Sequence, residues 1–165
     1  MLARILRKVF ARSAFGAASR VLFGSLAMVL AAAAAVGAAE RDDLGAALVG
    51  AASKGDVAAV RRLLGQGADP HAASTEGIPA LTTASAAGFT EVAELLIDFG
   101  ADVDRTGKVS TALMKAVTMH REKTVRALLA GGADVRQTTQ AGNTALHEAA
   151  TRKSAAIVQA LAGAG

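Results

Sequence analysis

The chain has 165 residues, of which 52% are hydrophobic and 3% aromatic, and it contains no cysteine, tryptophan or tyrosine. Its formal net charge is +4, but five of the 18 basic residues precede residue 40, leaving 13 basic against 14 acidic residues in the remainder. The positive charge thus belongs to the first 39 residues and is no sign of a nucleic-acid-binding domain, and the absence of cysteine excludes disulfides.

Residues 1–39 form a segment unlike the rest of the chain. Basic residues precede an almost wholly apolar run at 21–36, and the small residues Gly37, Ala38 and Ala39 follow it. This order is typical of a secretory signal peptide cleaved after Ala38 or Ala39. The alternative is an uncleaved membrane anchor, since residues 21–39 approach the ~20 residues needed to span a bilayer. We therefore expect an exported protein of bacterial type, periplasmic or secreted, or else anchored in the inner membrane and facing the periplasm.

Residues 40–165 contain a sequence repeat with a period of 32 or 33 residues. Leucine and alanine recur in register, and the sequence Gly-Ala-Asp ends three of the units. The registered columns are Leu48, Leu81, Leu113 and Leu146; Ala51, Ala84, Ala116 and Ala149; and Leu63, Leu96, Leu128 and Leu161. A period of this length with short apolar helices indicates a stacked helical array. We expect one domain, 40–165, with repeats at about 44–69, 77–102, 109–134 and 142–165.

Each unit is expected to form two short helices joined by a tight turn. In the second unit the helices are predicted at residues 79–87 and 90–99, with Val92, Leu96 and Phe99 on one face of the second helix. The turn between the helices carries Gly55, Gly88, His120 and Lys153 in successive units. If this turn needs a left-handed backbone, each residue other than glycine costs about 1 kcal/mol there. Polar segments rich in turn formers connect the units at 70–78, 103–110 and 135–143.

The sequence TALHEAA at residues 144–150 is similar to the T-P-L-H-x-A-A motif of the ankyrin-repeat family. Gly88, Glu91, Val92 and Leu96, followed by Gly-Ala-Asp, match the second half of that family's repeat. The resemblance covers the chain from about residue 44. It implies an all-α solenoid of about four helix-turn-helix repeats with short β-hairpin-like connecting loops, in which His147 hydrogen-bonds within its own turn near Thr144.

The same resemblance implies a non-catalytic protein–protein interaction module that binds a partner protein through its concave face. The family's contacts come from hairpin positions and from exposed positions of the first helix in each repeat. In this sequence those positions are Thr75, Glu76, Ile78, Thr83, Lys108, Ser110, Lys115, Met119, Gln140, Asn143, Glu148 and Arg152. Lys108, Lys115 and Arg152 would make the surface weakly basic, which favours an acidic patch on the partner. If the apolar segment is retained, the alternative is a membrane-tethered scaffold or assembly factor.

No residue pattern indicates catalysis or a bound metal or cofactor. His147 and Glu148 begin like the zinc motif H-E-x-x-H, but the fifth residue is Thr151, so the second ligand one turn later is missing. Asp102 and Asp104 lie in a connecting segment, where acidic pairs are expected to be solvated turn residues. We therefore expect a monomeric domain that is not an enzyme, uses no cofactor and binds no nucleic acid.

Overall fold

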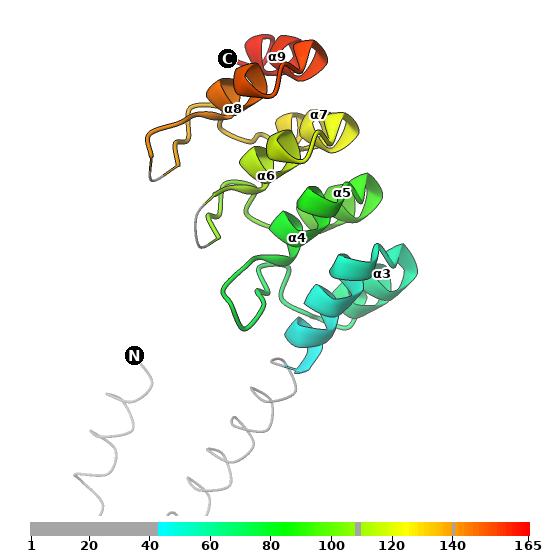
Figure 1. The fold of residues 1–165 in the computed structure, drawn as a ribbon. Helices are drawn as coiled ribbons and strands as arrows, with labels where there is room; N and C mark the ends of the chain where they lie inside the picture. Colours follow the sequence, from blue (N-terminus) through cyan, green and yellow to red (C-terminus); the bar gives the residue numbers. More distant parts are fainter. Residues whose placement is uncertain (1–42, 108–109, 140) are drawn as a thin grey trace, which may run out of the picture. The chain divides into compact units, whose positions relative to one another are not determined.

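The computed structural model describes residues 43–107, 110–139 and 141–165, which belong to one compact unit of the chain (Figure 1). The expected signal segment at 1–39 lies outside these residues, as do Lys108 and Gln140 from the expected contact set. Among the residues that the structure describes, no helix combines the length and the apolar character that crossing a bilayer requires.

The described chain consists of helix pairs stacked one above another, with the connecting loops projecting to one side (Figure 1). The first helical residues described are 43–54. The helices that follow are α3 (Val57–Gly65), α4 (Ala80–Ala87), α5 (Thr90–Asp98), α6 (Ala112–Thr118), α7 (Glu122–Ala130), α8 (Ala145–Thr151) and α9 (Ala155–Ala162).

Two rows of helices run along the stack. Residues 43–54 and helices α4, α6 and α8 form the inner row, nearer the loops, while α3, α5, α7 and α9 form the outer row (Figure 1). Each helix packs against its counterpart in the adjacent repeat, such as α4 against α6 and α5 against α7. Extended structure in the described residues is limited to two isolated bridges, Ala73 with Pro79 and Thr138 with Thr144. The all-α prediction is therefore confirmed for this part of the chain.

Residues that accept hydrogen bonds from free N–H groups begin several helices. At the start of α3, the Asp56 carboxylate accepts a hydrogen bond from the N–H of Ala59 at 2.9 Å. At the start of α8, Nδ1 of His147 lies 2.8 Å from the Thr144 hydroxyl and accepts the Thr144 N–H at 3.3 Å. Together these groups form a reciprocal cap at the start of the helix. The expected hydrogen bonding of His147 near Thr144 is confirmed.

The buried core follows the predicted columns except at Leu146, and the expected position of Phe99 also differs. Its largest fully buried side chains include Leu48, Leu96, Leu113, Leu128, Ile157, Val60, Val92, Val117 and Val125. Phe99 is 44% exposed, because α5 ends at Asp98 and Phe99 is the residue that follows it. The expectation that Phe99 shares a buried face with Val92 and Leu96 is wrong. Leu146 occupies the same column as the buried Leu113 but is 45% exposed, since no described residue covers that side of α8.

The turn between the two helices of each repeat has a left-handed backbone. Its φ angle is +71° at Gly55 and +88° at Gly88, and it remains positive at +56° in His120 and +55° in Lys153. The condition stated for this column, a left-handed backbone, is therefore met. His120 and Lys153 therefore carry a conformational cost that the glycines avoid.

Candidate partner-binding face

The connecting segments and the inner row of helices share one side of the stack, which we call the hairpin face (Figure 1). The structure places most of the predicted contact residues within reach of solvent. Thr75, Glu76, Met119, Asn143 and Arg152 are exposed, and Ile78, Thr83, Lys115 and Glu148 are partly exposed. That these residues contact a partner remains a prediction.

Ser110 differs from the other predicted contact residues because it is only 9% exposed. The connecting segment before it is one residue shorter than its two counterparts. The N–H of Gly107 donates to the carbonyl oxygen of Ser110 at 3.1 Å, which closes this short segment. The expectation that Ser110 offers its side chain to a partner is therefore corrected, because that side chain lies inside the fold.

The other two connecting segments have the same pattern of hydrogen bonds at their tips. The N–H of Ser74 donates to the carbonyl oxygen of Ile78 at 2.9 Å, and the N–H of Ile78 donates to Oγ of Ser74 at 3.2 Å. Thr139 and Asn143 repeat both bonds, at 2.9 and 3.2 Å. A hydroxyl within each segment thus closes its tip, which fixes the shape of the loop.

Side chains tie neighbouring connecting segments to one another. The N–H of Asp102 donates to Nδ1 of His71 at 3.3 Å, and Arg105 donates to the carbonyl oxygen of His71 at 2.9 Å. One repeat further, the N–H of Asp134 donates to Oδ1 of Asp104 at 2.9 Å. We call these three bonds the hairpin ties. The interpretation of Asp104 as a solvated turn residue is wrong, since its carboxylate joins two repeats.

The hairpin face carries less net positive charge than its sequence indicates. Nε of Arg152 lies 3.9 Å from Oε2 of Glu148, so the two charges partly offset each other. Lys115 forms no ion pair with any residue that the structure describes. Within the described residues, the unpaired positive charge among the predicted contacts therefore resides on Lys115, one helical turn before the exposed Met119 on the same inner-row segment.

Hydrogen bonding holds the carboxyl group of Asp134 in its ionised form. The pKa of Asp134 lies below its ordinary value of 3.8, chiefly because the backbone N–H of Arg136 donates to Oδ1 at 2.9 Å. Desolvation acts in the opposite direction, and the Arg136 guanidinium adds a weaker lowering effect. Asp134 therefore places a charged carboxylate at the turn that follows α7.

A groove at one end of the hairpin face is a feature that sequence analysis missed. It has a volume of about 560 Å³ and lies between the first inner helix and the connecting segment 69–75. Gly45, Ala46 and Gly50 line its helical side, where later repeats carry larger residues such as Lys115. Thr75, one of the predicted contacts, lines the other side. The signal was present in the sequence as three small residues on one face of the first helix.

The described residues contain no group of three or more histidine, cysteine or acidic side chains arranged to hold a metal ion. His147, which begins the incomplete zinc motif, directs Nδ1 to Thr144 in the helix cap.

Comparison with known proteins identifies the repeat. A family model described as ankyrin repeats (three copies) matches residues 48–139 and 108–165. A human relative, ankyrin repeat and KH domain-containing protein 1, is 48% identical over 67 residues, which are 41% of this chain. The matched part is 3% of that protein's own length, so the chain corresponds to a small part of the relative. Because the family model spans more than half of the sequence, the chain belongs to the ankyrin-repeat family, whose members are generally non-catalytic protein–protein interaction modules.

Proposed function

We propose that this chain binds a partner protein through the hairpin face, without catalysis. The observation that carries the proposal is the set of hairpin ties. The bonds from Asp102 to His71 and from Asp134 to Asp104 join each connecting segment to the next. A surface whose loops are already held in place loses little conformational entropy when a partner binds, so more of the contact energy becomes affinity.

The chemistry of the face favours an extended acidic segment on the partner. Lys115 supplies an unpaired positive charge among the described residues, and Met119 supplies 47% of its surface as an adaptable apolar contact. The groove lined by Gly45, Ala46 and Gly50 accepts backbone or small side chains at the other end of the face. A partner that places a carboxylate opposite Lys115 would therefore gain both charge complementarity and apolar contact.

Photo-crosslinking tests the location of this surface. A photo-reactive amino acid is placed at Met119 on the inner row or, as a control, at Lys123 on the outer helix α7 of the same repeat. Cells that naturally make the protein are irradiated, and the captured proteins are identified by mass spectrometry. We expect a specific partner from the Met119 site and not from the Lys123 site.

Charge reversal tests the chemistry of the same surface. Lys115→Glu should lower the yield of the Met119 crosslink by on the order of tenfold, because like charges would then face each other. Lys123→Glu is the matched control, since it makes the same change on the opposite face of the same repeat. Equal crosslinking from both sites would remove the hairpin face from the binding site. A Met119 crosslink that Lys115→Glu leaves unchanged would keep the face but remove Lys115 and the acidic partner segment from the proposal.

The proposal of export depends on the sequence of residues 1–39, which lie outside the described residues. Basic residues followed by an apolar run and three small residues support a cleaved signal peptide. Retention of the apolar run would instead make the domain a membrane-tethered scaffold. The intact mass of the protein purified from its own cells distinguishes the two, because cleavage after Ala38 or Ala39 removes the whole segment.

A further inference from the structure

The hairpin ties change their chemistry in the fourth repeat. Two of the three hairpin ties use the side chain two residues after the aspartate of a Gly-Ala-Asp turn. In successive connecting segments that position is occupied by His71, Asp104 and Arg136. His71 and Asp104 each accept a hydrogen bond from a backbone N–H of the following repeat. A guanidinium group has donors only, so Arg136 cannot accept such a bond. At this position the array presents a donor in place of an acceptor.

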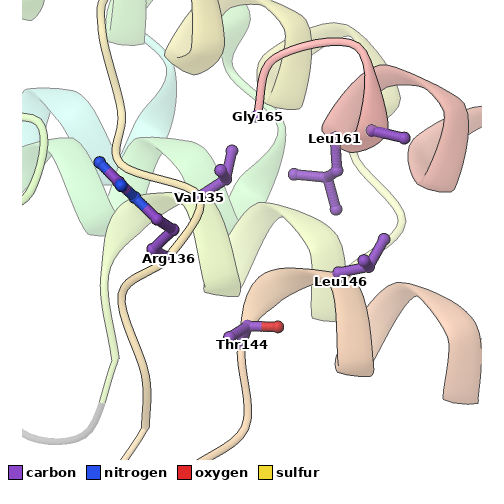
Figure 2. A pocket seen from close by; sticks show the side chains of 7 residues that line it. Val135, Arg136, Thr144, Leu146, Leu161 and Gly165 are labelled. Carbon is purple, nitrogen blue, oxygen red and sulfur yellow. The ribbon is translucent and has the colours of Figure 1, made fainter.

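Arg136 lies at the edge of an apolar hollow of about 300 Å³ (Figure 2). Val135, Leu146 and Leu161 line the hollow and face a common space. Ala162 also lines it, at a position where the preceding repeat carries the larger Leu129. Leu146 is 45% exposed, against 1% for its counterpart Leu113, so the described residues leave apolar surface uncovered on this side of the fourth repeat.

The guanidinium group of Arg136 has donors left for a further contact, while Asp134 partly offsets its charge. Its side chain is 89% exposed, and its Nε lies 3.4 Å from Oδ1 of Asp134. Its two terminal nitrogens have no hydrogen-bond partner among the described residues. In Figure 2 the guanidinium extends away from Leu146 and Leu161. A ligand that used both features would therefore need its negative charge and its apolar group on different residues.

We propose that this surface, which we call the Arg136 face, binds a short extended segment of a partner protein that carries a carboxylate side chain near a leucine-sized side chain. The apolar side chain enters the hollow beside Leu146, and the carboxylate accepts hydrogen bonds from Arg136. A stacked copy of this chain's own repeats fits the face poorly, because its turn N–H would meet the Arg136 cation where Asp104 offers an acceptor. The Arg136 face is separate from the Lys115 surface, so either proposal can fail without the other.

A peptide titration followed by NMR tests the proposal. The probe is the capped peptide acetyl-Thr-Leu-Thr-Asp-Thr-amide, in which leucine and aspartate share one side of an extended chain. Control peptides carry asparagine or lysine in place of the aspartate. We expect amide shifts centred on Val135, Leu146 and Leu161, with the asparagine peptide binding about three- to fivefold more weakly than the aspartate peptide and the lysine peptide binding most weakly.

Two variants separate the charge from the apolar contact. Arg136→Asp restores the acceptor found at Asp104, so it should abolish the preference for aspartate and favour the lysine peptide. Leu146→Ala should weaken all three peptides by a similar factor while the order of preference is kept. Because Arg136 and Leu146 are exposed, circular dichroism is expected to show an unchanged fold for both variants.

Three results would overturn the proposal. They are equal binding of the three peptides, amide shifts centred away from the Arg136 face, and a preference for aspartate that survives in Arg136→Asp. Sedimentation at increasing protein concentration adds a further check. Self-association that depends on Leu146 would assign the face to a second copy of the chain instead.

Discussion

The aromatic ring of Phe89 lies directly over Gly55, so that a Cβ atom built on this glycine would be 2.7 Å from Cδ1 and Cε1 of the ring. The next repeat shows the same relationship, with Cδ of Arg121 at 2.7 Å from a Cβ built on Gly88. Glycine is therefore needed at these two turns for its positive φ and also for the space it leaves to the following repeat. At the turn of the third repeat, the residue in the place of Phe89 is Ser154 of the fourth repeat. This turn itself carries a side chain, that of His120.

Replacing a covered glycine should therefore cost more than backbone strain. We expect Gly88→Ala to lower the free energy of unfolding by more than the ~1–2 kcal/mol that a left-handed backbone costs a residue with a Cβ. Gly88→Ala/Arg121→Ser should recover the excess but not the backbone cost. Urea denaturation of the two single variants and the double variant gives the coupling energy directly. Zero coupling would show that Arg121 moves away freely and that space plays no part.

At the turn that carries His120, we predict that introducing glycine has the opposite effect on stability. His120→Gly should raise the free energy of unfolding by about 0.5–1 kcal/mol, because glycine adopts φ near +56° without a steric penalty but loses more chain entropy on folding. The midpoint of urea denaturation measures the gain. His120→Ala is the control, and it should give no such gain because alanine keeps the Cβ. A destabilised His120→Gly would mean that the His120 side chain makes a contact worth more than the strain.

Two buried hydroxyls with different partners should respond in opposite ways to removal. Oγ of Ser85 is buried and has no hydrogen-bond partner among the described residues, whereas Oγ1 of Thr124 lies 2.8 Å from Oγ1 of Thr90 in the adjacent outer helix. We expect Ser85→Ala to leave stability unchanged or to raise it by up to about 1 kcal/mol, because an unpaired polar group is lost. Thr124→Val should lower stability by about 1 kcal/mol, because it leaves the Thr90 hydroxyl unpaired. Thermal unfolding followed by circular dichroism compares them, and a loss in both variants would point to a partner for Ser85.

The lowered pKa of Asp134 predicts a dependence of stability on acid. A carboxyl whose pKa is lower in the folded state stabilises the protein above its unfolded pKa, and this contribution disappears as the pH falls through the folded value. Because the folded value lies below 3.8, the difference in stability between the wild type and Asp134→Asn should be constant near neutral pH and should shrink below about pH 4. Urea midpoints measured at pH 6 and at pH 3 test this. A difference of the same size at both values would assign the effect of the substitution to something other than the charge.

Helix positions and their caps were predictable from the sequence because local chemistry decides them. The predicted helices at 79–87 and 90–99 correspond to α4 and α5 within one residue at each end. The cap formed by Thr144 and His147 depends on residues three apart in the sequence, so a motif alone identifies it. The left-handed turn followed from glycine at Gly55 and Gly88, where only glycine combines positive φ with room for the next repeat.

Contacts between repeats were harder to predict because they join residues about 30 positions apart. Asp104 lies in a polar segment whose sequence is typical of a solvated turn. Only the stacking of the repeats brings its carboxylate within hydrogen-bond distance of the N–H of Asp134. Ser110 is buried, and its connecting segment is one residue shorter than its counterparts. Alignment of the repeats does not predict which way a side chain points in a shortened segment. Helical periodicity placed Phe99 on the buried face of the helix, but α5 ends at the residue before it.

The hairpin ties also bear on how such a chain could have changed its length. Every tie, and every strong packing contact between helices, joins a repeat to itself or to its immediate neighbour. Within the part of the chain that the structure describes, these contacts do not close into a ring. Duplication or deletion of one whole stretch such as 70–102 would thus add or remove an acceptor and its donor together, whereas loss of part of such a stretch would leave one of them without its partner.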